Sequence, residues 1–259
     1  MRSASRVCAL LLAVAGAAST GACGGADPIA EASSPAAPTK AAEPRLQLAA
    51  RAAAAQDLRQ VAQYAFRANG RPQRTVVVTL AADDTWRVDV QGGALGGTVD
   101  IALVRTGGKT YHCALASTAY PTPGCVEVTK MSKTFDPLVW HLFTDWLTAF
   151  TDRDMPLVVS KANSILGTTG TCFSVDSSTV SVTSPVDAGI YCYADDGTLT
   201  AAKVSFGTLA LVAPPAAGPP TVTLPAAVVP GKPLPIASPS PSPSPSASGS
   251  LKPSPKPSA

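Results

Sequence analysis

The sequence is short of the residues that most enzymes use for catalysis. Its 259 residues include only two histidines, His112 and His141. It contains no G-x-S-x-G nucleophile motif, no S-x-x-K pair with supporting motifs, no H-E-x-x-H and no phosphate-binding G-x-x-x-x-G-K-[ST] loop. Nucleophilic catalysis needs a base within hydrogen-bond reach of the nucleophile, and the sequence gives no reason to pair either histidine with one. We therefore predict no catalytic residue and a protein that is not an enzyme.

Paired metal ligands and basic blocks are also missing. No C-x-x-C pair occurs, although tetrahedral zinc usually takes its ligands from tight cysteine or histidine pairs. The chain has 20 basic and 17 acidic side chains, and no basic block is interleaved with aromatic residues. Such a composition is not that of a nucleic-acid-binding protein. The sequence thus predicts no metal, no cofactor and no nucleic-acid partner.

The amino terminus has the three parts of an export signal. Arg2 and Arg6 precede the apolar run from Val7 to Ser19, and small residues follow up to Cys23. The apolar run is shorter than the roughly 20 residues that span a bilayer. The residues "TGAC" resemble the bacterial lipobox, with Thr in place of its usual Leu. The resemblance implies a signal peptide over residues 1–22, a lipidated Cys23 and attachment to the extracytoplasmic side of the cell membrane; the alternative is an ordinary signal peptide followed by a coincidental cysteine.

Low-complexity segments flank one domain. Residues 23–44 are Gly, Ala, Ser and Pro with few large apolar side chains, so they cannot offset the entropy of ordering and are expected to form a flexible tether. The Ser-Pro repeats near the carboxy terminus predict a disordered tail over residues 227–259. Removal of the signal leaves 18 basic and 17 acidic side chains, a net charge of +1. Residues 45–226 suit a single globular domain.

The four remaining cysteines are expected to form two disulfides. Cys113, Cys125, Cys172 and Cys192 follow the export signal, and four cysteines in an exported chain allow three pairings. Cys113 and Cys125 lie in one block of expected strands, and Cys172 and Cys192 lie in another. We therefore predict Cys113–Cys125 and Cys172–Cys192, each closing a short loop.

The residue pattern predicts two helices among many strands. Residues 45–60 are rich in Ala, Leu, Gln and Arg, which favour a helix. Residues 135–154 carry a wide apolar stripe at helical spacing, with Asp136 as a cap and Pro137 in the first turn. The intervening and following segments alternate or are β-branched, and we expect residues 189–213 to form one hairpin with Gly207 as a bend or bulge. Strands and helices segregate along the chain, as in the α+β class.

The order of these elements resembles a family of lipid carriers. Helix, strand meander, helix and carboxy-terminal hairpin, with the segments "DDTWRVDV", "CVEV", "CFSV", "GIYCYADDGTLT" and "TVTLPA", look like the LolA/LolB-like and LppX/LprG-like periplasmic carriers. The resemblance covers residues 47–225. It implies a curved antiparallel half-barrel sheet with an amino-terminal helix and a mid-chain aromatic helix that covers the concave face.

The aromatic helix is the best candidate for a binding surface. In such a fold its apolar side would line a cavity for an acyl chain; the alternative is that it fills the core. The candidate lining residues are Trp86, Leu142, Phe143, Trp146 and Phe150. We expect a non-catalytic envelope lipoprotein that binds the membrane through its anchor and binds a lipid or another apolar ligand. The alternative is an anchored module that docks another envelope protein and holds no small ligand.

Overall fold

The computed structural model describes residues 43–118, 120–177 and 184–238, all within one compact unit of the chain. The predicted signal peptide, Cys23 and the Ser-Pro repeats lie outside the described residues. The tether was predicted to end at residue 44, but Glu43 already begins a helix. None of the described helices is both long enough and apolar enough to cross a bilayer.

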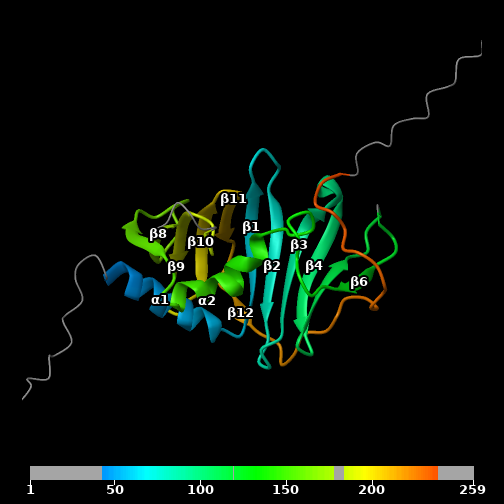
Figure 1. The fold of residues 1–259 in the computed structure, drawn as a ribbon, viewed down its shortest axis with the longest axis horizontal. Coiled ribbons are helices and arrows are strands. Elements are labelled where there is room, and N and C mark those ends of the chain that lie inside the picture. Colours follow the sequence, from blue (N-terminus) through cyan, green and yellow to red (C-terminus); the bar gives the residue numbers. More distant parts are fainter. Residues whose placement is uncertain (1–42, 119, 178–183, 239–259) are drawn as a thin grey trace, which may run out of the picture. The chain divides into compact units, whose positions relative to one another are not determined.

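A single antiparallel sheet of 12 strands forms the body of this unit. Its order is β6-β5-β4-β3-β2-β1-β11-β10-β9-β8-β7, and β12 pairs with β1. The sheet is open, with β6 at one end of the order and β7 at the other (Figure 1). The strands are β1 Gln60–Ala68, β2 Arg74–Leu80, β3 Trp86–Ala94, β4 Val99–Thr106, β5 Lys109–Ala114, β6 Gly124–Glu127, β7 Leu157–Ala162, β8 Thr171–Ser177, β9 Gly189–Tyr193, β10 Leu199–Val204, β11 Gly207–Leu211 and β12 Ala216–Ala217. The expected α+β class and curved half-barrel sheet are confirmed.

Helix α1 spans Glu43–Gln56, shorter than the predicted 45–60 because Gln60 already belongs to β1. Its buried side chains are Leu48, Ala52 and Ala55, the stripe expected from their spacing. In Figure 1, α1 and α2 (Asp145–Thr151) lie over the half of the sheet that contains β8 to β11. The β9–β10 turn comes close to α1: at Gly197, with φ of +91°, an added Cβ would lie 2.4 Å from the backbone of Ala55.

The mid-chain aromatic segment is not one helix, as its apolar stripe predicted. It forms a 3-10 turn, η2 (Val139–Phe143), followed by the short helix α2. The chain breaks between them at Thr144, whose φ and ψ are −133° and −108°. The carboxylate of Asp136 accepts a hydrogen bond from the backbone N–H of Leu138 and so holds the entry to η2. Helical spacing finds the buried side chains but does not reveal such a local side-chain-to-backbone contact.

The carboxy-terminal strands also differ from the prediction. Residues 189–211 form three strands rather than one hairpin, because Gly207 begins β11 and pairs with Ala68 of β1. Residues 220–224 form no strand, although Val222 among them is buried. The packed chain continues past residue 227, where the tail was predicted to begin. Cys125 of β6 donates to Ala227 and accepts from Val229, and Ile236 donates to Thr134.

The two faces of the sheet have different cores. The face that α1 and α2 cover, which we call the inner face, carries the large aromatic side chains Tyr64, Phe173, Tyr191 and Tyr193. The opposite, outer face holds two smaller clusters, each built around a pair of cysteines. The predicted disulfides Cys113–Cys125 and Cys172–Cys192 are confirmed. Each joins directly paired positions of neighbouring strands, with Cα atoms 3.9 Å apart.

Candidate functional site

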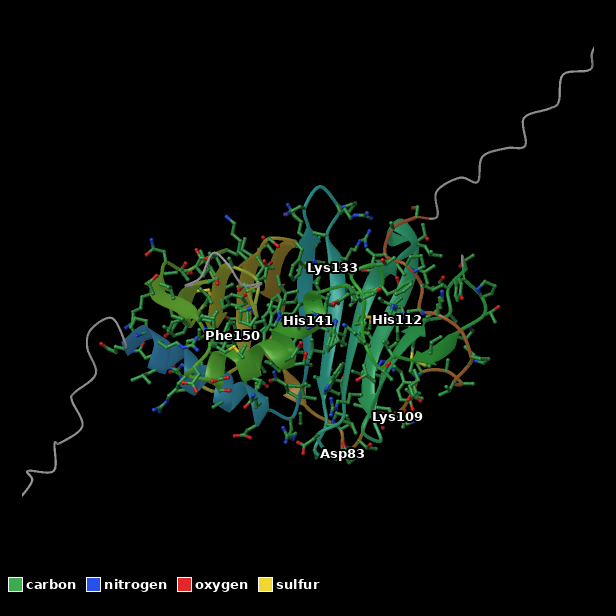
Figure 2. The ribbon with its side chains drawn as sticks, in the orientation of Figure 1. Asp83, Lys109, His112, Lys133, His141 and Phe150 are labelled. Atoms are coloured by element: carbon green, nitrogen blue, oxygen red, sulfur yellow. A yellow bond between two sulfur atoms is a disulfide. The ribbon has the colours of Figure 1, made fainter. Side chains whose placement is uncertain are left out.

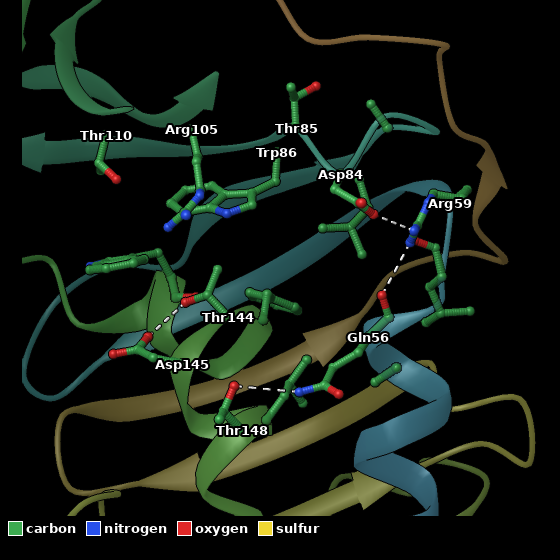
Figure 3. Close-up of a pocket in the computed structure, with 17 residues that line it drawn as sticks. Gln56, Arg59, Asp84, Thr85, Trp86, Arg105, Thr110, Thr144, Asp145 and Thr148 are labelled. Atoms are coloured by element: carbon green, nitrogen blue, oxygen red, sulfur yellow. Dashed lines mark hydrogen bonds and ion pairs between the residues drawn. The ribbon is translucent and has the colours of Figure 1, made fainter. Parts of the chain in front are cut away.

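A pocket of about 450 Å³ opens between the helices and the inner face, near the β2–β3 turn (Figure 3). One wall comes from the end of α1, and another from η2 and α2. Its floor comes from β2 to β5. The lining residues are Ala55, Gln56, Leu58, Arg59, Leu80, Ala81, Asp84, Thr85, Trp86, Arg105, Thr110, Trp140, Phe143, Thr144, Asp145, Leu147 and Thr148. This volume falls in the range of about 300–1,000 Å³ that is usual for small-molecule sites.

The floor is a row of four paired residues across neighbouring strands. Leu80 of β2 is the register partner of Trp86, Trp86 is the partner of Arg105 in β4, and Arg105 is the partner of Thr110 in β5. All four line the pocket. Because directly paired residues point to the same side of a sheet, the row presents apolar, aromatic, cationic and hydroxyl groups in that order. With strands about 4.8 Å apart, the row spans about 14 Å.

Two stacked indole rings join the floor to the wall: Trp86 belongs to the floor, and Trp140 belongs to the η2 wall. The ring centroids of Trp86 and Trp140 are 5.5 Å apart, with planes inclined by 23°. Trp140 is held in place because its Nε1–H donates to Oδ1 of Asp136 at 2.8 Å. Asp136 also fixes Leu138, whose φ of +62° is unusual for a bulky residue. This wall is therefore preformed rather than assembled around a ligand.

His141 supports the wall from behind. Its Nε2 lies 2.9 Å from Oδ2 of Asp136, and its Nδ1 lies 2.8 Å from the carboxylate of Asp145. Burial lowers the pKa of His141, but hydrogen bonds and charge from the two carboxylates outweigh it and raise the pKa to about 9. The ring is therefore an imidazolium at neutral pH, with both N–H groups donating. It stacks between Trp140, at a centroid distance of 4.1 Å, and Trp146, at 5.6 Å.

The pKa values of the two carboxylates around His141 are lowered, whereas the pKa of His141 is raised. Burial raises the pKa of Asp136, but its hydrogen bonds and the charge of His141 lower it to a net value below the usual range. The same balance lowers the pKa of Asp145, where the hydroxyl of Thr144 adds a further hydrogen bond. Both carboxylates are thus charged at neutral pH. The cluster holds the indole of Trp140 in place.

The rim of the pocket carries two arginines with different partners. Arg59 forms an ion pair with Asp84 at 2.5 Å and donates to the carbonyl of Gln56 at 3.1 Å. Figure 3 shows these contacts at one end of the pocket, and Arg105 beside Trp86 at the other end. Within the part of the chain that the structure describes, the guanidinium of Arg105 has no hydrogen bond and no ion pair.

The structure brings only some of the sequence-predicted candidates to this pocket. Trp86 and Phe143 line it. Leu142 and Phe143 border a second cavity of about 10 Å³ behind it, together with the buried Tyr64. Trp146 and Phe150 pack against Tyr191 in the core, with centroid distances of 6.3 Å and 5.0 Å. A ligand contact for any of these side chains stays a prediction.

The sequence did not single out the side chains that shape the pocket. Asp136 was expected only to cap a helix, and Trp140 was not among the candidate lining residues. The i to i+4 spacing of His141 and Asp145 was the available signal. Arg105 gave no signal, because a cation near a strand end is ordinary; its importance comes from its register with Trp86.

His112, the other histidine, lies apart from His141 on the β4–β6 side of the sheet (Figure 2). It is 1% exposed, and burial lowers its pKa to about 4, so it is neutral. It borders a separate pocket of about 230 Å³, which residues 229–234 also line. The described residues contain no group of three or more His, Cys, Asp or Glu arranged to hold a metal ion.

Comparisons with known proteins yield little beyond this geometry. No protein-family profile matches the sequence, and no curated protein matches it. Among solved structures, one titled "Crystal structure of MucB" aligns with a TM-score of 0.43 and 12% sequence identity. The alignment covers 66% of this chain, and the chain spans 58% of the MucB chain.

Proposed function

We propose that this protein is a membrane-anchored envelope lipoprotein that binds a lipid or another apolar ligand without catalysis. The anchor is Cys23, and the ligand site is the pocket of about 450 Å³ floored by Trp86. The sequence resemblance to LolA/LolB-like and LppX/LprG-like carriers supports the choice of ligand class. The observation that carries the proposal is the preformed indole pair of Trp86 and Trp140 at the pocket wall.

The pocket favours an apolar ligand for a physical reason. Trp86, Trp140, Phe143 and Leu147 line it, and two of these rings are already stacked. A ligand that covers this surface removes apolar area from water, worth about 25 cal/mol per Å². Because Asp136 and His141 already hold Trp140, binding does not have to order that side chain. The apolar part of the lining can therefore contribute affinity beside the polar residues of the rim.

The proposal is tested by analysing what the protein carries. The full chain with Cys23→Ala, purified without detergent, should hold an extractable lipid or apolar molecule in nearly one-to-one amount by mass spectrometry. Trp86→Ala should reduce this amount several-fold, because the variant removes the centre of the pocket floor. Val158→Ala, at an exposed position on β7, is the matched control and should retain the ligand.

A clean protein would contradict the proposal. If the parent carries no apolar molecule and binds none when it is added, the pocket is not a lipid site. Specific capture of one membrane protein by that ligand-free chain would then favour the docking module. Equal ligand content in the parent and Trp86→Ala would place the ligand elsewhere on the protein.

The anchor is tested separately, because Cys23 lies outside the described residues. Fractionation of producing cells should find the parent with the membrane and Cys23→Ala in the soluble fraction. The mass of the parent's amino-terminal peptide should show added acyl chains. Equal membrane association of the two forms, with no acyl mass on the parent, would show that Cys23 is not the anchor.

A further inference from the structure

The arginine at the polar end of the pocket floor has no partner within the protein. Arg105 is exposed and lines the pocket between Trp86 and Thr110. Among the described residues, no carboxylate, carbonyl or hydroxyl accepts a hydrogen bond from its guanidinium. By contrast, Arg59 at the opposite rim is paired with Asp84. The pocket therefore presents one unpaired cation, at one end of an apolar surface.

Three carboxylates of the pocket and of β6 already have partners. Asp84 is bound to Arg59, and Asp145 is bound to His141, which carries a positive charge. On β6, Glu127 pairs with Lys109. The His141 cluster keeps a net charge of −1, because one imidazolium lies between two carboxylates, but neither carboxylate is bound to Arg105. An anion placed at this end would therefore meet a donor free to bind it.

We propose that the pocket binds an amphiphile whose anionic group sits at Arg105 and Thr110 while its apolar part lies over Trp86 and Leu80. This inference rests on the proposed function and names the chemical class of its ligand. The guanidinium presents a planar fork of N–H donors that matches carboxylate and phosphate oxygens. A carboxylate and a phosphate share this chemistry, so a fatty acid and a phosphorylated lipid are both candidates.

The order of groups along the floor sets the orientation of the ligand. The four register partners run from Leu80 through Trp86 and Arg105 to Thr110, over about 14 Å. An anionic head at the β4–β5 end therefore directs the chain across β3 and β2, towards Leu58 and the end of α1. The reverse orientation would place the anion beside Asp84 and leave Arg105 over an apolar chain.

Binding can be followed through the tryptophans of the full chain. The chain has three tryptophans, and two of them, Trp86 and Trp140, line the pocket. The probes are dodecanol, dodecanoate and dodecyl phosphate, which share one chain length and are used below their aggregation concentrations. Because Arg105 is exposed, an ion pair there is worth up to about 1 kcal/mol, or about fivefold in affinity. Both anions should therefore bind about fivefold more tightly than dodecanol, and added salt should reduce the difference.

Variants at Arg105 isolate the head-group contact. Arg105→Gln should abolish the advantage of the anions and leave dodecanol binding unchanged. Arg105→Lys keeps the charge and should retain most of the advantage. Arg67→Gln, an exposed arginine on β1 outside the pocket, is the matched control and should behave as the parent. A larger advantage for dodecyl phosphate than for dodecanoate would identify a phosphorylated head group, and the reverse would identify a fatty acid.

The failures of the two proposals are distinguishable. Equal binding of all three probes to the parent would overturn the role of Arg105 and leave the apolar site intact. Loss of dodecanol binding in Arg105→Gln, with the thermal unfolding midpoint unchanged, would also overturn it, because the arginine would then shape the pocket rather than bind the head. If no probe binds the parent, both the head-group contact and the proposed function are wrong.

Discussion

The mid-chain aromatic segment has two parts, η2 and α2, which share one apolar pattern but differ in what they pack against. In α2, Phe150 is fully buried and packs edge-on against Tyr191 of β9. In η2, Trp140 is only partly buried and faces the pocket, where it stacks on Trp86. The difference lies in what covers each part: α1 lies against α2, whereas η2 faces the end of β2 to β5. The same residue pattern can therefore seal a core or border a cavity.

The largest expected effect concerns the sealed part. Phe150→Ala removes a fully buried ring and should lower the free energy of unfolding by about 3–5 kcal/mol in urea denaturation. Trp86→Ala, at the pocket, should lower it by less than about 2 kcal/mol, because part of the ring already faces solvent. Equal losses for the two variants would mean that the pocket half is packed as tightly as the core half.

Removal of either disulfide should cause the next largest loss in the free energy of unfolding. Cys113–Cys125 closes a loop with a sequence separation of 12, and Cys172–Cys192 one of 20. Double substitution to Ala should cost about 3 kcal/mol for each pair in the chain-entropy model. Both pairs lie on the outer face, so neither variant should change dodecanol binding at temperatures where the protein is folded. A binding loss confined to one pair would show that its half of the sheet shapes the pocket.

The charged His141 behind Trp140 should stabilise the fold at neutral pH and lose this contribution at alkaline pH. The pKa of His141 is raised from its ordinary value of 6.5 to about 9. Its stabilising contribution is therefore fully present below about pH 6.5 and is lost as the pH rises through 9. The loss should be on the order of 2 kcal/mol, given the partial exposure of Asp145.

Unfolding free energies measured between pH 6 and 10 test this expectation. His141→Gln should remove most of the decline seen in the parent over that range. His112→Gln should leave the alkaline decline in place, because the pKa of His112 is lowered to about 4 and affects stability only as the pH falls below about 6.5. If the unfolding free energy of His141→Gln declines with pH as much as that of the parent, His141 is not a charged group held between the two carboxylates.

The smallest effect is expected at the rim. Asp84→Asn breaks an exposed ion pair with Arg59 and should change stability by less than about 1 kcal/mol. Asp84 has φ of +64°, a conformation that Asn tolerates well. Because the carboxylate head is expected at Arg105, at the other end of the row, the freed Arg59 should be screened from it, and both dodecanoate and dodecanol should bind as they bind the parent. Tighter binding of dodecanoate alone would place its head at Arg59 and contradict the orientation proposed for the ligand.

Local sequence patterns predicted most of the helices and strands, whereas the pocket floor is formed by pairing between residues far apart in the sequence. Alternation around Tyr64 and the β-branched run at 75–79 were enough to place strands, and shared strand blocks were enough to pair the cysteines. The row that joins Trp86 to Arg105 depends on the register of β3 against β4, which hydrophobic periodicity does not specify. The break at Thr144 and the contact of Asp136 with Leu138 could not be read from the apolar stripe.

The boundaries of the domain were harder to predict for the same reason. Composition marked residue 227 as the start of the tail, since Pro and small residues dominate from there. Residues 227–229 nevertheless bond to the backbone of Cys125, on an edge strand that would otherwise be open. Main-chain hydrogen bonds of this kind place few demands on side chains, so the sequence carries little trace of them.

The position of a bound chain relative to the two tryptophans of the mid-chain segment tests the central claim most directly. Bromine quenches indole emission on contact, so 12-bromododecanol can be titrated into two single-tryptophan forms of the full chain. The form that keeps Trp140 carries Trp86→Phe and Trp146→Phe, and the form that keeps Trp146 carries Trp86→Phe and Trp140→Phe. The account predicts strong, saturable quenching of Trp140 and little quenching of Trp146, because only Trp140 lines the pocket. Stronger quenching of Trp146 than of Trp140 would place the chain in the core beneath α2 and contradict the pocket as the ligand site.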